Sequence, residues 1–145
     1  MEIFSLSPDF GESRVVEALS EALQRTFHPD KSVETVRRRI LELVKRDESR
    51  IIVALDDQRD LVGTLSLHKS PVPGQVIASD FYISDVHRRR GLGTRLAGYG
   101  IRQCKSYFGA ESIAAQVYPD APAWLIRFYE SLGFLKVQNK YVLFI

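Results

Sequence analysis

The first third of the chain carries apolar residues at the spacing of two amphipathic helices. Between residues 12 and 27 they recur every three or four positions, and a second such series follows Ser32 as far as Val44. Ser32 favours a helix start there because serine is a good N-cap residue. A short strand at residues 3–6 is expected before the first helix. Residues 37–39 and 45–46 are all basic, and their simplest interpretation is the solvated face of the second helix.

Strand patterns follow from residue 50 onward. Residues 50–55 are a β-branched run, a polar turn comes next, and residues 61–68 alternate between the two faces of a strand. Residues 76–84 form a further strand, in which alternation predicts that Ile77, Phe81 and Ile83 share one side. Short turns join these three strands, so we expect them to pair in the antiparallel sense.

The remaining elements alternate between helix and strand. A helix is predicted at residues 91–108, a strand at 112–117, a helix at 120–132, and two short strands at 134–137 and 141–145. Because a helix connects the strands at 76–84 and 112–117, these two should be parallel, with a right-handed crossover. The predicted fold class is α/β: one domain over residues 1–145, with a mixed, mostly antiparallel sheet of about seven strands and four helices on both faces.

Composition and charge narrow the class of protein. Apolar residues make up 45% of the 145 residues, which is ordinary for a globular domain. The formal net charge of +2 does not favour nucleic acid as a partner, and no apolar run approaches the length of a membrane span. The N-terminus lacks the features of a signal peptide, and Cys104 is the only cysteine. We therefore expect a cytoplasmic protein without a disulfide.

A basic loop with two glycines, just before the helix at 91–108, is the first candidate for a binding site. Gly91 and Gly93 lack a Cβ, so a ligand can approach the backbone closely. The first N–H groups of a helix have no internal partner, and the helix dipole adds positive charge there. Together with the three arginines at 88–90, these groups favour a phosphate. The loop has no Gly-Lys-Ser/Thr, and Leu96 replaces the third glycine of the dinucleotide fingerprint.

Residues 123–134 are the second candidate. Leu125, Phe128 and Leu132 form an apolar helical stripe, and the spacing places Tyr129 at its edge. A tyrosine in such a position commonly packs while its hydroxyl bonds an acceptor. Trp124 is expected to pack or to stand at the rim of a cleft.

These two motifs together resemble the GNAT superfamily of N-acetyltransferases. The resemblance rests on Arg88, Gly91 and Gly93 in a strand-to-helix loop, and on Phe-Tyr-Glu at 128–130 with Gly-Phe at 133–134 after the next strand. The order of elements also resembles that family over nearly the whole chain. The resemblance implies acetyl-CoA as co-substrate, two central parallel strands that splay apart, and direct passage of the acetyl group to an amine in a ternary complex. No metal is expected.

The resemblance also implies roles for individual residues. Backbone N–H groups of the loop would hold the coenzyme pyrophosphate, and the strand backbone at Phe81 and Ile83 would pair with the coenzyme arm. The N–H of Ile83 is the candidate to hold the thioester oxygen. Tyr129 matches the tyrosine that protonates the departing thiolate and is the expected catalytic residue. The expected coenzyme-binding residues are Phe81, Tyr82, Ile83, Arg88, Arg89, Arg90, Gly91, Leu92, Gly93 and Thr94.

Two positions depart from the family pattern. Pro122 stands where many members have an asparagine, so a contact to the coenzyme arm would be absent or supplied by Asp120. Arg89 stands where many members have a glycine. Phosphate binding should survive that change, because backbone N–H groups supply it.

Several alternatives stay open at the level of the sequence. The general base has no motif, and Asp80, Asp85, His68 and a water molecule are all candidates. The amine acceptor could be a small molecule or a protein, and a homodimer is possible, but a membrane is not expected as a partner. A non-catalytic acyl-CoA-binding sensor or interaction module is the alternative to an enzyme.

Overall fold

The computed structural model describes residues 1–8, 13–88, 90–117 and 119–145, and these form one α/β unit. Its strands are β1 (Glu2–Ser5), β2 (Ser49–Leu55), β3 (Leu61–Lys69), β4 (Gln75–Ile83), β5 (Ser112–Ala115), β6 (Leu135–Val137) and β7 (Lys140–Phe144). Its helices are α1 (Ser13–Phe27), α2 (Val33–Leu43), α3 (Leu92–Ser106) and α4 (Ala123–Ser131), with a 3-10 turn η1 at Asp85–His87. The strands form one mixed sheet in the order β1-β2-β3-β4-β5-β7-β6, which confirms the predicted fold class.

The element boundaries follow local residue chemistry. Ser32 caps α2 as predicted, and its side chain accepts a hydrogen bond from the backbone N–H of Thr35. The start of α4 differs from the prediction of residue 120, because Pro122 is extended (φ −66°, ψ 146°) and forms the N-cap. A residue that precedes proline avoids the helical conformation, so the helix begins only after Pro122. The predicted start of the first helix, residue 12, lies outside the described residues.

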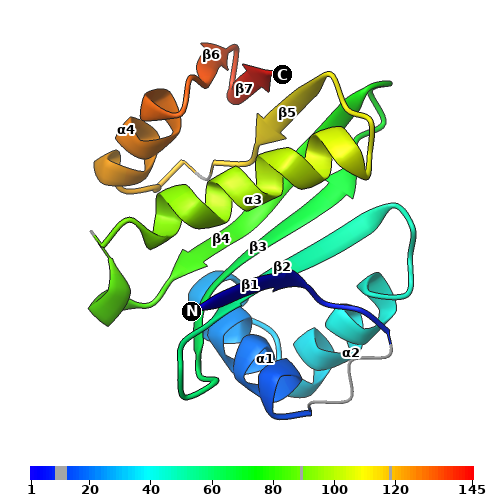
Figure 1. The fold of residues 1–145 in the computed structure, drawn as a ribbon, viewed down its shortest axis with the longest axis vertical. Helices are drawn as coiled ribbons and strands as arrows, with labels where there is room; N and C mark the ends of the chain where they lie inside the picture. The colour runs from blue at the N-terminus through cyan, green and yellow to red at the C-terminus, as the bar shows by residue number, and fades with distance from the viewer. Residues whose placement is uncertain (9–12, 89, 118) are drawn as a thin grey trace.

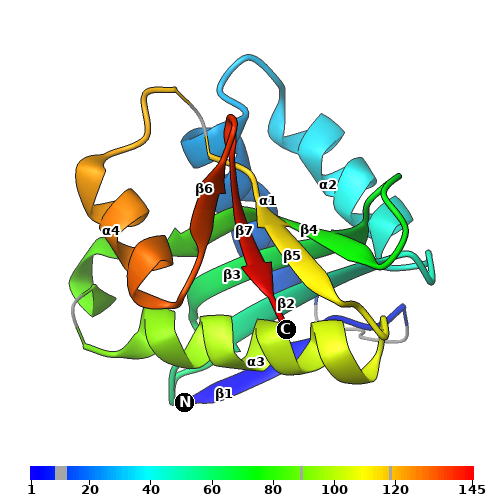
Figure 2. The ribbon, with the colours of Figure 1, turned by 90° about the horizontal axis from the view of Figure 1, so that it is seen from above.

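Helices cover both faces of the sheet. Figures 1 and 2 show α1 and α2 on one face and α3 with α4 on the other. Successive residues of β2 enter the two cores in turn: Ile51 and Val53 pack beneath α1 and α2, and Ile52 and Ala54 beneath α3. None of the described helices has the length and apolar content that a membrane crossing requires.

The parallel pair β4 and β5 separates halfway along β4. The two strands are in register from Gln75 with Ser112 to Ala78 with Ala115. One further backbone bond joins Gln116 N to Ala78 O at 3.0 Å. β5 ends at this level while β4 continues to Ile83, as Figure 1 shows. The predicted splay of the parallel pair is therefore present, and it leaves the second half of β4 without a strand on that side.

A β-bulge interrupts β4 where the two strands separate. Ser79 pairs with Ser66 and Tyr82 pairs with Thr64, so two residues, Asp80 and Phe81, lie opposite one residue of β3. Asp80 has a φ of 52°, in the left-handed region that non-glycine residues rarely adopt.

This bulge corrects one sequence prediction. Val76, Ala78 and Ile83 enter the core beneath α3, and Phe81 packs against it. Ile77 instead pairs with His68, whose side chain is on the opposite face of the sheet. The prediction that Ile77 shares a side with Phe81 and Ile83 is wrong, because the extra residue at the bulge shifts the alternation by one position.

Candidate functional site

A cleft of about 470 Å³ opens between the end of β4, the N-terminus of α3 and the helix α4. The cleft joins the two motifs that lie far apart in the sequence. Six of the predicted coenzyme-binding residues line it, together with two aromatic residues of α4. The lining residues are Phe81, Ile83, Arg88, Gly91, Gly93, Thr94, Trp124 and Phe128.

Three of the other four predicted binding residues do not line the cleft. Leu92, the first residue of α3, is buried in the core, and Arg90 is exposed and does not line the cleft. Tyr82 points away from the cleft, because its neighbours Phe81 and Ile83 face it and alternate residues of a strand point to opposite sides. Arg89 lies outside the described residues.

The N-terminus of α3 forms one wall of the cleft. Gly91 is its N-cap, with a φ of 80° that glycine adopts without strain. The first helical bond runs from Arg95 N to Gly91 O, so the N–H groups of the three residues between them have no partner inside the helix. The dipole of this 15-residue helix adds positive charge at the same end. An anion is therefore favoured at this wall.

Gly91 and Gly93 contribute in different ways. A Cβ on Gly91 would meet no atom within 4 Å, so this position needs glycine for its φ rather than for space. A Cβ on Gly93 would stand 3.5 Å from ring atoms of both Phe81 and Phe128, in ordinary van der Waals contact. A larger side chain at residue 93 would therefore fill the cleft without straining the backbone.

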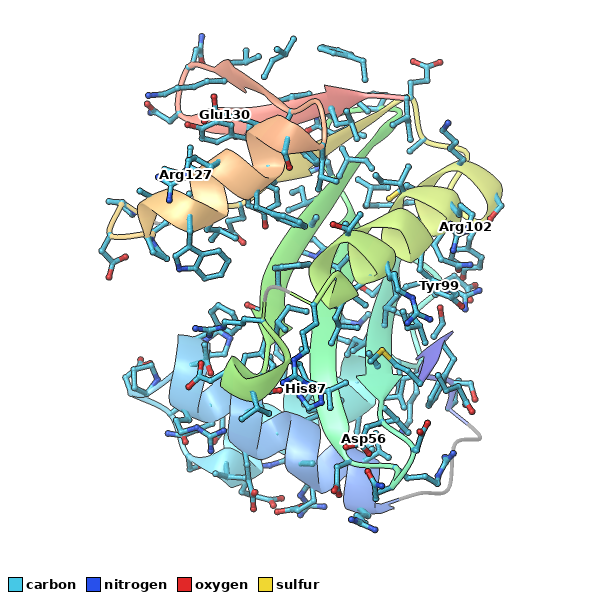
Figure 3. The ribbon with its side chains drawn as sticks, turned by 60° about the vertical axis from the view of Figure 1, so that its left-hand side comes forward. Asp56, His87, Tyr99, Arg102, Arg127 and Glu130 are labelled. Carbon is cyan, nitrogen blue, oxygen red and sulfur yellow. The ribbon has the colours of Figure 1, made fainter. Side chains whose placement is uncertain are left out.

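Arg88 holds the loop to the end of β4. Its Nε donates to the carbonyl oxygen of Ile83 at 3.1 Å, and its Nη1 lies 2.9 Å from Asp85 Oδ1. The guanidinium carbon lies 5.4 Å from the ring centroid of Trp124, which places Trp124 at the rim of the cleft as predicted. Figure 3 shows His87 in the turn between β4 and α3, and Arg127 and Glu130 on the exposed side of α4.

The backbone of Ile83 points toward the open side of β4. Ser84 N donates to Val62 O at 2.9 Å, so Ser84 and Val62 form a hydrogen-bonded pair of the antiparallel ladder. Ile83 and its partner Gly63 are next in register and are therefore a non-hydrogen-bonded pair. The N–H and C=O of Ile83 thus point away from β3, to the side where β5 has already ended. The Tyr82 backbone, one residue earlier, faces β3.

Tyr129 lies deeper than its place in the sequence pattern predicts. It is the most buried residue of α4, with 5% of its surface exposed, and it is not at the edge of the apolar stripe. Its ring centroid is 5.2 Å from that of Phe134 and 6.4 Å from that of Phe81. Burial raises the pKa of Tyr129 to about 12, so the phenol keeps its proton at neutral pH.

Two aromatic rings of the cleft lining are neighbours of Tyr129. Phe81 and Phe128 stack with centroids 5.3 Å apart and line the cleft, which Tyr129 does not. Behind them, the same two rings and Tyr129 line an apolar cavity of about 30 Å³. The Tyr129 hydroxyl makes no hydrogen bond to a described residue. The phenol therefore lies next to the cleft lining and has no hydrogen-bond partner among the described residues.

A second cavity, of about 770 Å³, lies on the opposite face of the sheet beneath α2. Asp80 and His68 project into it from β4 and β3, and His28 from the segment after α1. His28 Nε2 lies 3.9 Å from Asp80 Oδ2. Because Asp80 and Phe81 are consecutive residues, this cavity and the cleft adjoin each other across β4.

Burial governs the electrostatics of this cluster. Only 18% of the Asp80 side chain is exposed, and burial raises the pKa of its carboxyl, while His28 and His68 act in the opposite direction. Burial likewise lowers the pKa of His68. Two of the proposed bases, Asp80 and His68, are therefore together in one cavity. The third, Asp85, is 86% exposed and pairs with Arg88.

Metal binding and a reactive cysteine are the next two features to consider in the described residues. No group of three or more His, Cys, Asp or Glu side chains in that part of the chain is arranged to hold a metal ion. Cys104 is buried, and burial raises the pKa of its thiol to about 12. The thiol therefore stays protonated and packs as a small core residue.

Sequence reasoning missed three members of these cavities. Phe128 lines the cleft, although the pattern indicates only core packing for it. His28 and Arg39 line the second cavity, and Arg39 belongs to a basic run interpreted as a solvated face. The chain segments that carry His28 and Asp80 are far apart in sequence, and no local pattern signals their contact.

Comparisons with known proteins agree on the family and the fold. Residues 16–134 match the model of the acetyltransferase (GNAT) family, whereas no curated protein sequence matches. Solved structures of similar fold include a GNAT acetyltransferase of Staphylococcus aureus Mu50, with TM-score 0.75 and 14% identity over 97% of this chain and 98% of that one.

Two other structures of similar fold are of enzymes named after their substrates. An aminoglycoside 6'-N-acetyltransferase complexed with coenzyme A has TM-score 0.74 and 18% identity, over 98% of this chain and 94% of that one. A chimeric spermidine N-acetyltransferase from Vibrio cholerae and hSSAT has TM-score 0.77 and 14% identity, over 99% and 96%. At these identities the likeness concerns the fold.

The buried carboxyl of Asp80 predicts a pH-dependent change in stability. Because its pKa is raised from the ordinary value of 3.8, Asp80 stabilises the fold most at acid pH, and this contribution is lost as pH rises through the folded pKa. Asp80→Asn does not titrate, so its stability relative to the wild type should be higher at about pH 8 than at about pH 4. Urea unfolding at both pH values measures this, with Asp85→Asn as the exposed control. If the unfolding free energies of Asp80→Asn and the wild type differ by the same amount at both pH values, burial does not raise the pKa of Asp80.

Proposed function

Because the chain belongs to the acetyltransferase (GNAT) family, we propose that it transfers an acetyl group from acetyl-CoA to an amine. The observation that carries this proposal is the opening of two cavities from opposite faces onto consecutive residues of β4, Phe81 and Asp80. One cavity fits the donor and the other the acceptor. The acetyl carbon and the amine would meet at the gap between β4 and β5.

The cleft residues suit the coenzyme. The partnerless N–H groups at the start of α3 would bind the pyrophosphate, and Arg88 and Thr94 line the same space. The outward N–H of Ile83 would hold the thioester oxygen as its negative charge develops. Acetyl-CoA supplies the acetyl group as a thioester. Positioning and this backbone donor then provide much of the rate acceleration.

Asp80 is the best placed general base. It has the positive φ of the bulge, lies in the cavity opposite the coenzyme cleft, and has His28 and His68 beside it. Its raised pKa makes it a better proton acceptor than an ordinary carboxylate. Asp80 would remove the proton of the acceptor ammonium, so that the neutral nitrogen attacks the acetyl carbon.

Tyr129 remains the proposed acid for the departing sulfur. Its phenol is protonated at neutral pH and makes no hydrogen bond to a described residue. The Phe81 and Phe128 rings line the cleft and are its neighbours, with centroids 6.4 Å and 6.1 Å from that of Tyr129, so the proposal requires the coenzyme sulfur to reach the phenol beside these rings.

The competing function is a non-catalytic acyl-CoA-binding module. Such a protein needs the cleft but has no use for a buried carboxylate on the opposite face. An assay of free-thiol release with a panel of amines separates the two functions. Amine-dependent thiol release supports the transferase, and coenzyme binding without release from any amine supports the binding module.

Gly93→Val should weaken acetyl-CoA binding by at least about tenfold. The valine side chain would occupy the cleft beside the Phe81 and Phe128 rings, while the backbone at residue 93 needs no glycine. Titration calorimetry measures the affinity, and a thermal melt of the free protein reports folding. Gly98→Val is the matched control: it is in the same helix, and a Cβ there meets only Arg102 Nη1, at 3.6 Å. Equal affinities for the two variants would place the coenzyme outside this cleft.

Asp80→Asn should lower kcat by about 10²–10⁴-fold at neutral pH, the usual contribution of a positioned base. The affinity for acetyl-CoA should stay unchanged, because Asp80 lines only the cavity on the other face. Steady-state kinetics with the best amine of the panel measures kcat, and calorimetry measures affinity. Asp57→Asn serves as control for loss of an exposed carboxylate, because Asp57 lines neither cavity. If Asp80→Asn has wild-type turnover, Asp80 is not the base, and His68 or water would have that role.

Tyr129→Phe should lower kcat by at least about tenfold, because the phenol would no longer protonate the sulfur. The ring and its packing against Phe81 and Phe134 remain, so the melting temperature and the acetyl-CoA affinity should be nearly unchanged. Turnover and a thermal melt on the same variant are the measurements. Unaltered kcat would mean that Tyr129 only packs and that another group protonates the thiolate.

A further inference from the structure

The cavity beneath α2 carries more positive than negative charge. Its cations come from three places: the segment after α1, the α2 region and the end of β3. They are Lys31, Arg39, Arg46 and Lys69, and the carboxylates in the same lining are Glu48 and Asp80. Asp80 faces His28 at 3.9 Å, which leaves Glu48 as the one other negative group among the described lining residues.

The cations of this cavity differ from their neighbours on α2, because no described carboxylate pairs with them. Arg37 pairs with Glu34 and Glu17, and Arg38 pairs with Glu34, so these two charges are compensated on the outer surface. Among the described residues, none of the four cavity cations makes an ion pair. Arg39 is near enough to lower the pKa values of both Asp80 and His68.

Unpaired cations that surround a cavity attract an anionic group and repel a polycation. They also favour the neutral form of an amine that enters, because a like charge nearby lowers the pKa of an ammonium group. The volume of about 770 Å³ is in the range of small-molecule sites. Spermidine and aminoglycosides, which the proteins of similar fold acetylate by name, carry several positive charges and fit this cavity poorly.

Building on the proposed function, we propose that the acceptor is a small amine that also carries an anionic group, a carboxylate or a phosphate. Its amine would lie against Asp80 and its anionic group against Arg39. The remaining cations would add attraction without fixing the position of the ligand. Arg39 would then be a specificity-determining residue that acts on substrate binding and not on the chemical step.

Two matched pairs of amines test this proposal. O-phosphoethanolamine against ethanolamine isolates the phosphate, and glycylglycine against glycylglycinamide isolates the carboxylate, while the amine stays similar within each pair. We expect kcat/KM to be at least about tenfold higher for the anionic member of one pair, which also identifies the anion. Spermidine and kanamycin are polycations that serve for comparison, and they should be poorer acceptors than the preferred anionic amine.

Arg39→Gln should raise KM for the preferred anionic amine by at least about tenfold, with little change in kcat or in KM for its uncharged counterpart. Arg38→Gln is the matched control, because it removes the adjacent arginine of the same helix, outside the cavity, and should leave KM unchanged. Polycations as the best acceptors, or equal effects of the two substitutions, would overturn the proposal.

Titration calorimetry of the same amines on the coenzyme A-bound protein separates this inference from the proposed function. Tighter binding of an anionic amine, weakened by Arg39→Gln, would support the inference even if no acetyl transfer occurs, in which case the proposed function fails. Acetyl transfer without any preference for an anionic amine would uphold the proposed function and overturn the inference. Absence of both binding and transfer would overturn the inference.

Discussion

The separation of β4 from β5 beyond Ala78 is the constraint on which the rest of this structure depends. A strand in the middle of a sheet normally pairs on both sides, because buried backbone polar groups without partners cost free energy. Here β4 continues to Ile83 with a neighbour on one side only. In the proposed function the outward N–H of Ile83 serves a ligand, as the edge of a sheet serves an added strand.

The bulge at the same point sets which side chains meet that ligand. By adding one residue, it turns Asp80 toward the cavity beneath α2 and Phe81 toward the cleft beside α3 and α4. Two molecules can therefore approach adjacent residues from opposite faces of one sheet. The charge of each cavity follows from the groups that line it. These are a helix N-terminus and Arg88 in one cavity, and in the other a buried carboxylate with cations that pair with no described carboxylate.

The sequence was sufficient for the element order, the parallel pair and the position of the glycine loop, because periodicity and turn residues are local signals. It was not sufficient for the side assignment of Ile77, since a bulge has no reliable local signature. The sequence also placed Tyr129 at the edge of the apolar stripe of its helix. In the structure, Phe134 and Phe81, which belong to other parts of the chain, pack against it. The sequence did not suggest the role proposed for Arg39, because only the structure distinguishes it from Arg37 and Arg38, which have carboxylate partners.

Amide hydrogen exchange at Ile83 and Tyr82 tests the central claim most directly, since these neighbouring N–H groups point to opposite sides of β4. The Tyr82 amide faces β3 and should be protected with or without ligand. The Ile83 amide faces the open side and should exchange faster in the free protein, then slow by at least about tenfold when acetyl-CoA binds. Unchanged exchange at Ile83 with saturating acetyl-CoA would contradict the account, because the coenzyme would then bind without using the gap between β4 and β5.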